Sequence, residues 1–406
     1  MSKITVIDSL MGSGKTSWSI QYINEATEEN FLYITPFLDE VSRVINNTER
    51  EFTQPINKGK GKLTAINDML ARQEDIAATH ELFRWLNKDS REFIENGKYT
   101  LILDEVLSVL EPLNVKRDNL KILLESQCIS IDKNGYVVWN PCKHEYDTDF
   151  NDLKMMADNH SLICVNGALL LWKYPPEIFE LFDKIYILTY LFEASILHSY
   201  FDLHEIEYEY QSIKKENDHY DLVDYFKPDL SEVAAKMDIY EGKLNCSFTQ
   251  KSGSLSKTWF TAERSKSDVA KLKNNLYNYI RNITNAKSDE VIWTTFKDAQ
   301  SKLAGRGFTK RFIPCNCRST NEFSNTSILA YCVNIYPHPG IINYLSQNNI
   351  YLDQDLYALS EMIQWIWRSR IRNGETIQIY VPSVRMRRLL YDWLEINKKA
   401  ERKIID

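Results

Sequence analysis

The residues with the most evident chemistry form a glycine-rich stretch, Ser9 to Thr16, near the N-terminus. An apolar β-type run, Ile4–Ile7, precedes it, and a helical pattern from Ser17 to Ala26 follows. In a strand–loop–helix of this kind, backbone N–H groups and the helix N-terminus bind phosphate oxygens. We expect Lys15 to reach the β- and γ-phosphates of a nucleotide, and the Thr16 hydroxyl to ligate Mg²⁺. The expected nucleotide-contacting residues are Gly12, Ser13, Gly14, Lys15, Thr16 and Ser17.

Two acids, Asp104 and Glu105, directly follow the apolar run Tyr99–Leu103. An acid pair at the end of a buried strand, at this distance after a phosphate-binding loop, is the Walker B pattern. We expect Asp104 to hold Mg²⁺, mostly through water, and Glu105 to polarise the attacking water. Together with Lys15, this pair predicts nucleoside triphosphate hydrolysis.

An arginine-rich run lies late in the chain, from Gln364 to Arg372. Hydrolysis that is tied to domain closure needs arginines from a second domain that close over the γ-phosphate. Arg368, Arg370 and Arg372 are the candidates for this role.

The elements that must position these residues alternate short apolar strands with helical segments, which predicts an α/β fold with parallel sheets. The alternation is interrupted between about 113 and 176, where Asn134-Gly135 predicts the turn of a β-hairpin in an inserted segment. Near residue 200 the pattern changes to a two-residue alternation. We therefore place one domain over 1–199, with the insertion inside it, and a second over 200–406.

Composition limits the class of protein. The chain has 406 residues, enough for two or three domains, and a net charge of −7 that argues against a uniformly basic nucleic-acid-binding surface but not against a local basic groove. No apolar run approaches the ~18 residues of a membrane span, and we expect no membrane association. The seven cysteines have no Cys-x-x-Cys pair, so we expect reduced thiols and a cytoplasmic location.

Taken in order, these segments resemble a superfamily 2 helicase of the DEAD-like kind found in phages and other mobile elements. The stretch Ser9 to Thr16 looks like motif I, Thr35-Pro36 like motif Ia, and Asp104-Glu105 like motif II. Thr189 to Ser195 stands where motif III does, and Gln364 to Arg372 looks like motif VI. Trp293-Thr294-Thr295 and Arg318 to Asn321 are placed like motifs IV and V.

The resemblance implies two tandem RecA-like domains, with ATP and Mg²⁺ as cofactors and nucleic acid as partner, DNA in preference to RNA. It also implies a role with replication proteins, in the host cytoplasm if the gene belongs to a phage. The catalytic residues it implies are Lys15, Glu105, Gln364, Arg368, Arg370 and Arg372. The nucleic-acid contacts it implies are Thr35, Pro36, Arg43, Thr79, His80, Thr294, Thr295, Lys297, Thr320 and Asn321.

The sequence departs from the family at several points. Ser9 replaces the first glycine of the general loop pattern, motif III lacks Ser-Ala-Thr, and motif V lacks a Gly-Ile/Leu-Asp core. The family's second motif VI arginine falls on Ile371, so Arg370 and Arg372 both remain candidates. Two other functions stay open: a terminase-like DNA-packaging ATPase, and a nucleotide-dependent loader or switch. Oligomeric state is not determined by the sequence.

Overall fold

The apolar runs of the first half pair into one sheet, which dominates the first of two units in the computed structural model. The structure describes residues 1–406 except 1–2, 58, 60, 146–148, 317–321 and 396–406. The first unit comprises Met1–Phe226 with His338–Leu352, and the second comprises Lys227–Pro337 with Asp353–Asp406. The α/β class with parallel sheets and a hairpin-containing insertion is confirmed. The boundary we placed at 199/200 lies inside the first unit.

The sheet of the first unit has eight strands in the order β13-β12-β1-β11-β5-β2-β4-β3, and all neighbours are parallel except β12 and β13. Register pairs Asp8 with Thr189 and Leu188 with Asp104, so β1, β11 and β5 end at one edge. In such sheets ligands bind at the carboxyl ends of the strands. The strands are β1 (Lys3–Asp8), β2 (Asn30–Thr35), β3 (Phe52–Thr53), β4 (Asp75–Thr79), β5 (Tyr99–Asp104), β11 (Lys184–Thr189), β12 (Glu209–Glu216) and β13 (His219–Asp224).

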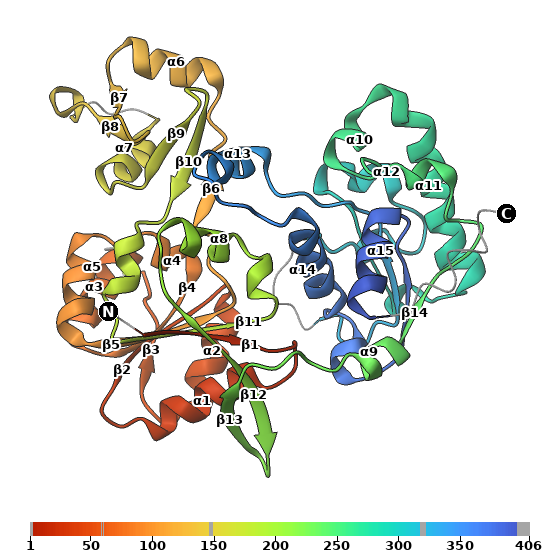
Figure 1. Cartoon of the computed structure of the whole chain (residues 1–406), viewed down its shortest axis with the longest axis horizontal. Coiled ribbons are helices and arrows are strands. Elements are labelled where there is room, and N and C mark those ends of the chain that lie inside the picture. The colour runs from red at the N-terminus through yellow and green to blue at the C-terminus, as the bar shows by residue number, and fades with distance from the viewer. Residues whose placement is uncertain (1–2, 58, 60, 146–148, 317–321, 396–406) are drawn as a thin grey trace. The chain divides into compact units, whose positions relative to one another are not determined.

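Helices cover both faces of this sheet (Figure 1). Alternate strand residues explain the two layers: Leu101 and Leu103 join the core on one face, whereas Ile102 joins the core on the other. The helices are α1 (Lys15–Glu25), α2 (Leu38–Asn47), α3 (Lys62–Ala71), α4 (His80–Arg84), α5 (Lys88–Gly97) and α8 (Ile196–Leu203). The core on one face includes residues of α1 and α2, and the core on the other includes residues of α3, α5 and α8.

The insertion follows β5 and folds as a small subdomain (Figure 1). Its three-stranded antiparallel sheet has the order β6-β10-β9, and β7 pairs with β8 in the hairpin whose turn Asn134-Gly135 indicates. Gly135 has φ 86°, the left-handed conformation that such a turn requires. The elements are β6 (Leu110–Pro112), α6 (Arg117–Glu125), β7 (Ile129–Ile131), β8 (Val137–Trp139), α7 (Asn151–Asp158), β9 (Leu162–Val165) and β10 (Leu169–Lys173).

A late segment of the chain returns to the first unit. Helix α13 (Pro339–Gln347) packs against β6 and β10, and its Ile341 and Leu345 are buried in the core of that unit. Gln347 Nε2 donates a hydrogen bond to Asn166 Oδ1 at 2.8 Å. We did not anticipate this return, because the apolar pattern of α13 does not specify which core receives it.

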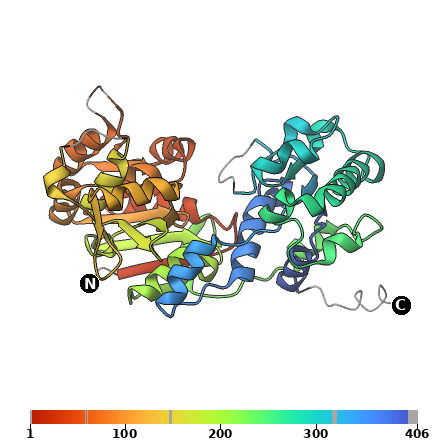
Figure 2. The ribbon, with the colours of Figure 1, turned by 90° about the horizontal axis from the view of Figure 1, so that it is seen from above.

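The second unit is built on a four-stranded parallel sheet with the order β14-β17-β16-β15. Helices of this unit are seen in Figure 2 in green to blue. Its strands are β14 (Met237–Ile239), β15 (Val291–Thr294), β16 (Ile328–Tyr331) and β17 (Ile377–Tyr380). Its α-helices are α9 (Ser231–Ala235), α10 (Lys257–Thr261), α11 (Lys266–Asn278), α12 (Gln300–Leu303), α14 (Gln354–Ile366) and α15 (Val384–Trp393). None of the helices in the described part of the chain is long and apolar enough to cross a membrane.

Candidate active site

The phosphate-binding loop, residues 9–16, connects β1 to α1 at the carboxyl edge of the large sheet. Gly12 and Gly14 have φ 85° and 99°, which side-chain-bearing residues rarely adopt. The Lys15 ammonium donates to the carbonyl oxygens of Ser9 at 2.5 Å and Leu10 at 3.1 Å, so it closes the loop from inside. The positive φ values of both glycines are consistent with a tight loop before a helix N-terminus, where phosphate groups bind in other proteins.

Ser9, which replaces the first glycine of the loop pattern, has a structural role. Its side chain is buried, and its hydroxyl accepts a hydrogen bond from the backbone N–H of Ile213 on β12 at 3.0 Å. Its own N–H donates to the carbonyl of Thr189 at 3.0 Å. A glycine could not accept the bond from β12, so the departure from the pattern is explained by the strand beside the loop.

The two acids of the Walker B pattern lie at the end of β5. The Tyr33 hydroxyl donates to Asp104 Oδ2 at 3.1 Å. Burial, then the charges of Glu105 and Glu40, raise the pKa of Asp104 to about 7. Glu105 has φ 70° and its N–H donates to the Leu188 carbonyl at 3.0 Å. A non-glycine residue held in this conformation is an outlier of the kind that clusters at functional sites.

Three carboxylates act electrostatically on the Lys15 ammonium. Burial lowers the pKa of Lys15, and the charges of Glu105, Asp8 and Asp104 raise it in part. Asp8 is buried at the end of β1 and accepts the backbone N–H groups of Leu191 at 3.0 Å and Phe192 at 2.8 Å. Asp8 thereby fixes the segment after β11 beside the loop.

These residues fit ATP with Mg²⁺. Mg²⁺ usually binds through one or two carboxylates and the phosphates of the substrate, which suits Asp104 with the Thr16 hydroxyl. Burial first, and then the charges of Glu105 and Glu40, raise the pKa of Asp104, and a divalent cation would favour its ionised form. The loop supplies N–H groups and Lys15 for the phosphates.

Among the expected nucleic-acid contacts of the first unit, Thr35 is fully buried and its hydroxyl has no hydrogen-bond partner among the described residues, so it presents nothing to a ligand. Pro36 is partly exposed. Arg43 is exposed on α2 and pairs with Glu40 at 3.2 Å. His80 Nε2 lies 3.2 Å from the Asp104 carbonyl oxygen. The Thr79 hydroxyl accepts from Leu82 N–H at 3.4 Å as the cap of α4.

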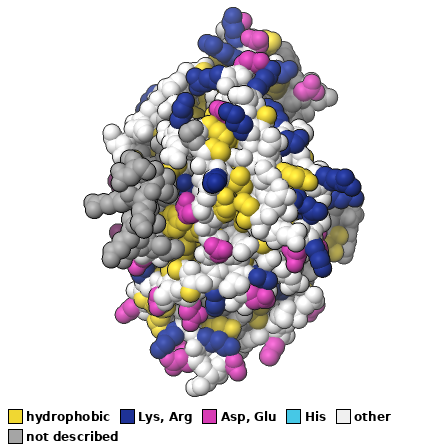
Figure 3. Space-filling model, turned by 90° about the vertical axis from the view of Figure 1, so that its right-hand side faces the viewer, with side chains coloured by type: hydrophobic (Ala, Val, Ile, Leu, Met, Phe, Trp, Pro, Cys, Tyr) yellow, Lys and Arg dark blue, Asp and Glu magenta, His cyan; other side chains and the backbone are white. Residues whose placement is uncertain are grey.

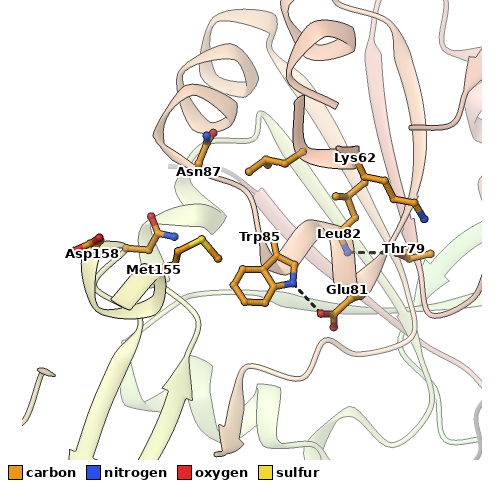
Figure 4. A pocket seen from close by; sticks show the side chains of 10 residues that line it. Lys62, Thr79, Glu81, Leu82, Trp85, Asn87, Met155 and Asp158 are labelled. Carbon is orange, nitrogen blue, oxygen red and sulfur yellow. Dashed lines mark hydrogen bonds between the residues drawn. The ribbon is translucent and has the colours of Figure 1, made fainter. Parts of the chain in front are cut away.

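Thr79 also lines a cavity of about 580 Å³ between the core and the insertion. Figure 4 shows the indole of Trp85 between Glu81, to which it donates at 2.8 Å, and Met155 of α7. Lys62 and Asn87 are among the polar residues that line this cavity. Sequence patterns did not indicate this cavity, because its walls come from α3, α4 and the insertion.

In the second unit, Thr294 and Thr295 are fully buried at the end of β15, and neither hydroxyl has a partner among the described residues. Burial places both away from solvent, contrary to what a nucleic-acid contact needs. Lys297 is exposed, and Thr320 and Asn321 lie outside the described residues.

The face in Figure 3 carries Lys and Arg side chains interspersed with acidic and hydrophobic ones, which is not a uniformly basic surface.

The arginine segment begins in α14 and continues through the turn after it. Gln364 Nε2 lies 3.5 Å from the Ser360 hydroxyl, and Arg368 is partly exposed just beyond the helix. The Arg370 guanidinium donates to Thr376 O at 2.5 Å and to Thr376 Oγ1 at 3.4 Å. Arg372 is exposed, whereas Ile371 is buried. Arg370 therefore serves the local turn, and the family's second arginine position is a core residue here.

Comparison with known proteins identifies the family. A protein described as SPbeta prophage-derived uncharacterized protein YonV, from Bacillus subtilis strain 168, is 44% identical over 411 residues, covering 97% of this chain and 99% of that protein. This chain belongs to the YonV family. The model of the YonV middle domain matches residues 110–172, the span of the insertion. The model of the YonV C-terminal Rossmann-like domain matches residues 231–394.

Solved structures resemble this YonV-family chain in fold at low sequence identity. S. tokodaii Xpd4 aligns with a TM-score of 0.51 and 11% identity, covering 98% of this chain and 95% of that one. This likeness bears on the fold alone. A chain described as XPD_APO has a TM-score of 0.49 and 13% identity, with coverage of 96% and 95%. A chain described as XPD_Helicase has a TM-score of 0.44 and 12% identity, covering 98% of this chain and 95% of that one. Those two scores are too low to support a conclusion about this chain.

Two residues of the YonV-family site were missed by sequence reasoning. Asp8 lies between the expected strand Ile4–Ile7 and the loop, and Tyr33 lies within an apolar run, yet both reach the site at the sheet edge. A signal was present for Asp8, since an acid ends the apolar strand immediately before the loop. No local signal distinguished Tyr33, because only the pairing of β2 with β5 brings its hydroxyl to Asp104.

Proposed function

We propose that the chain is an ATP hydrolase that works as a helicase or translocase of superfamily 2 on nucleic acid, DNA in preference to RNA. One observation carries the proposal. The loop that carries Lys15 follows β1, and the acid pair Asp104 and Glu105 ends β5, so both lie at the carboxyl edge that these strands share with β11. A glycine loop, a lysine and an acid pair in this arrangement support triphosphate hydrolysis.

In the proposed reaction, the loop N–H groups and Lys15 bind the β- and γ-phosphates. Thr16 and Asp104 hold Mg²⁺, which would supply positive charge against the phosphate oxygens. Glu105 orients a water whose oxygen attacks the γ-phosphorus as the bond to the β–γ bridging oxygen breaks. Ser13, Gly14 and Ser17 complete the loop and the start of α1 around the nucleotide.

The second unit contributes arginines to this proposal. We assign Arg368 to the γ-phosphate and prefer Arg372 to Arg370 as the second arginine, because Arg370 already bonds Thr376. Gln364 keeps its expected role with them. Domain closure would then control hydrolysis.

For nucleic acid, the proposal retains Pro36, Arg43, Thr79, His80 and Lys297, and it omits the buried Thr35, Thr294 and Thr295. Thr320 and Asn321 keep their expected role. Contacts of this kind to phosphates confer affinity without sequence preference. The prophage origin of the YonV relative supports a role in a mobile genetic element. The proposal keeps replication proteins as partners and the host cytoplasm as location.

The test is ATP hydrolysis by the purified chain alone, with single-stranded DNA, with forked DNA and with RNA. We expect stimulation by single-stranded DNA, loss of hydrolysis in Lys15→Ala and Glu105→Gln, and loss of stimulated hydrolysis in Arg368→Ala. An unstimulated ATPase with normal Arg368→Ala activity would favour a terminase-like or loader function. A wild-type chain that does not hydrolyse ATP would refute the proposal.

A further inference from the structure

The hairpin formed by β12 and β13 contacts the start of the phosphate-binding loop through side chains. Strand β12 pairs with β1 in parallel from Thr5 to Ile7 and then continues past the end of β1. The Ser212 hydroxyl donates to the Asp8 carbonyl at 3.3 Å, and the Ser9 hydroxyl accepts from Ile213 N–H at 3.0 Å. The hairpin is thus joined to both residues at the entry to the loop.

A second set of bonds joins the hairpin to α1, the helix that follows the loop (Figure 1). Gln21 Nε2 donates to the Tyr220 carbonyl at 3.1 Å, and Tyr220 N–H donates to Gln21 Oε1 at 2.9 Å. One amide side chain therefore satisfies both backbone groups of one residue on β13. This two-point pairing fixes the position of Tyr220 along the helix.

The ring of Tyr220 lies directly against the loop. A Cβ atom built on Gly14 would come within 2.1 Å of Tyr220 Cε1 and 2.8 Å of Cδ1. Gly14 has φ 99° and immediately precedes Lys15. The ring thus occupies the space beside the residue whose left-handed conformation orients the Lys15 N–H and side chain.

The hairpin and the Walker B acids lie on opposite sides of β1. In the sheet order β13-β12-β1-β11-β5, β12 is next to β1 on one side, whereas Asp104 belongs to β5, two strands away on the other. The hairpin contacts the loop that binds phosphates and is separated from the acids of hydrolysis. Its effect should fall on nucleotide binding more than on the chemical step.

We propose that the β12–β13 hairpin is a clamp that holds the phosphate-binding loop in its nucleotide-binding conformation, with Gln21 and Tyr220 as positioning residues that set nucleotide affinity. This inference rests on the proposed ATPase function and identifies what preorganises its site. A loop already held in its bound form loses less conformational entropy when the nucleotide binds.

The test combines ATPase kinetics with titration of ADP by calorimetry on the full chain. Gln21→Ala and Tyr220→Leu should each raise the KM for ATP and the Kd for ADP about tenfold, while kcat stays within about twofold. Tyr220→Phe keeps the ring on Gly14 and should behave as wild type. Lys214→Ala, an exposed change on the same hairpin that removes a pair with Glu216, is the matched control.

The outcomes separate the clamp from the function on which it rests. Unchanged KM and Kd in folded Gln21→Ala would overturn the clamp even if Tyr220→Leu did not fold. A fall in kcat at constant KM, or a Tyr220→Phe variant as weak as Tyr220→Leu, would also overturn it. A wild-type chain that neither binds ADP nor hydrolyses ATP would refute the proposed function and the clamp together.

Discussion

The Nε2 atom of His80 lies 3.2 Å from the backbone carbonyl oxygen of Asp104. A carbonyl only accepts, so the Nε2–H tautomer donates this bond. Since β2 stands between β4 and β5 in the sheet, the imidazole reaches past the end of β2 to the Walker B residue. The bond links a proposed nucleic-acid residue to a proposed Mg²⁺ ligand.

This link predicts that His80 couples nucleic-acid binding to hydrolysis. In His80→Ala we expect basal ATPase activity to stay within about threefold and stimulation by single-stranded DNA to fall at least fivefold, a loss of about 1 kcal/mol of coupling. His80→Gln can still donate to the carbonyl and should retain more of the stimulation. ATPase rates with and without DNA measure both values, and full stimulation in His80→Ala would contradict the coupling.

The hydrogen bond from Tyr33 to Asp104 is expected to set how much Mg²⁺ the ATPase reaction needs. The Tyr33 hydroxyl donates to Asp104, and this hydrogen bond lowers the pKa of Asp104. Tyr33→Phe removes the bond, so the carboxyl group becomes harder to ionise. A hydrogen bond to a charged group contributes about 1.5–3 kcal/mol. We expect the half-saturating Mg²⁺ concentration for ATPase activity at pH 7 to rise roughly fivefold or more.

The matched control is Tyr99→Phe, which removes a hydroxyl that donates to the Glu74 carbonyl at 3.0 Å in the same sheet. Its Mg²⁺ dependence should equal that of the wild type. Equal shifts in the two variants would show a general loss of packing rather than an effect on Asp104.

His204 predicts a pH dependence of stability. Burial, with a contribution from the charge of Lys173, lowers the pKa of His204 to about 4, from an ordinary value near 6.5. Between these values the unfolded chain binds the extra proton, so the free energy of unfolding falls as pH falls from about 6.5 to 4. Urea unfolding at pH 7 and pH 4.5 measures this loss of unfolding free energy. We expect the loss to be smaller in His204→Asn than in the wild type by on the order of 1–2 kcal/mol.

His198→Asn on α8 is the control for that experiment, since, among the described residues, the His198 ring, unlike that of His204, has an acidic partner 3.6 Å away, the Asp202 carboxylate. This variant should keep the wild-type dependence over the same window. If His204→Asn loses as much stability on acidification as the wild type, His204 is not the group responsible.

Arg385 predicts a structural role for the basic helix α15. Its side chain is 8% exposed, and it bonds Asp355 at 2.7 Å, Asn334 Oδ1 at 2.8 Å and the carbonyls of Ile335 and Gln354 at 2.8 Å. Arg385→Met would remove this donor from the Asn334 side chain and the Ile335 carbonyl, while Asp355 keeps Arg388 as a partner. We expect the unfolding free energy to fall by about 1–3 kcal/mol. Thermal denaturation should show a lower transition for this variant.

Arg388→Met is the comparison on the same helix. Its side chain is 49% exposed and contacts the same Asp355 at 3.4 Å, so we expect a change below about 1 kcal/mol. Similar destabilisation by the two variants would mean that burial of the guanidinium is not the cause.

Local sequence patterns determined much of the first unit. Apolar runs predicted β1 and β5, because burial on both faces of a parallel sheet leaves a continuous apolar signature. The loop glycines and the acids Asp104 and Glu105 could be singled out for a different reason. Phosphate and metal chemistry constrains residue type over a few neighbouring positions.

Tertiary structure alone decided how those elements combine. Strand order brings Tyr33 to Asp104 and places β12 beside Ser9, and it buries Thr35, Thr294 and Thr295. The same packing returns α13 to the first unit and uses Arg385 as a buried anchor. Periodicity reports that a face is apolar or that a position follows a strand, but pairing between distant segments depends on complementary surfaces that no local window contains.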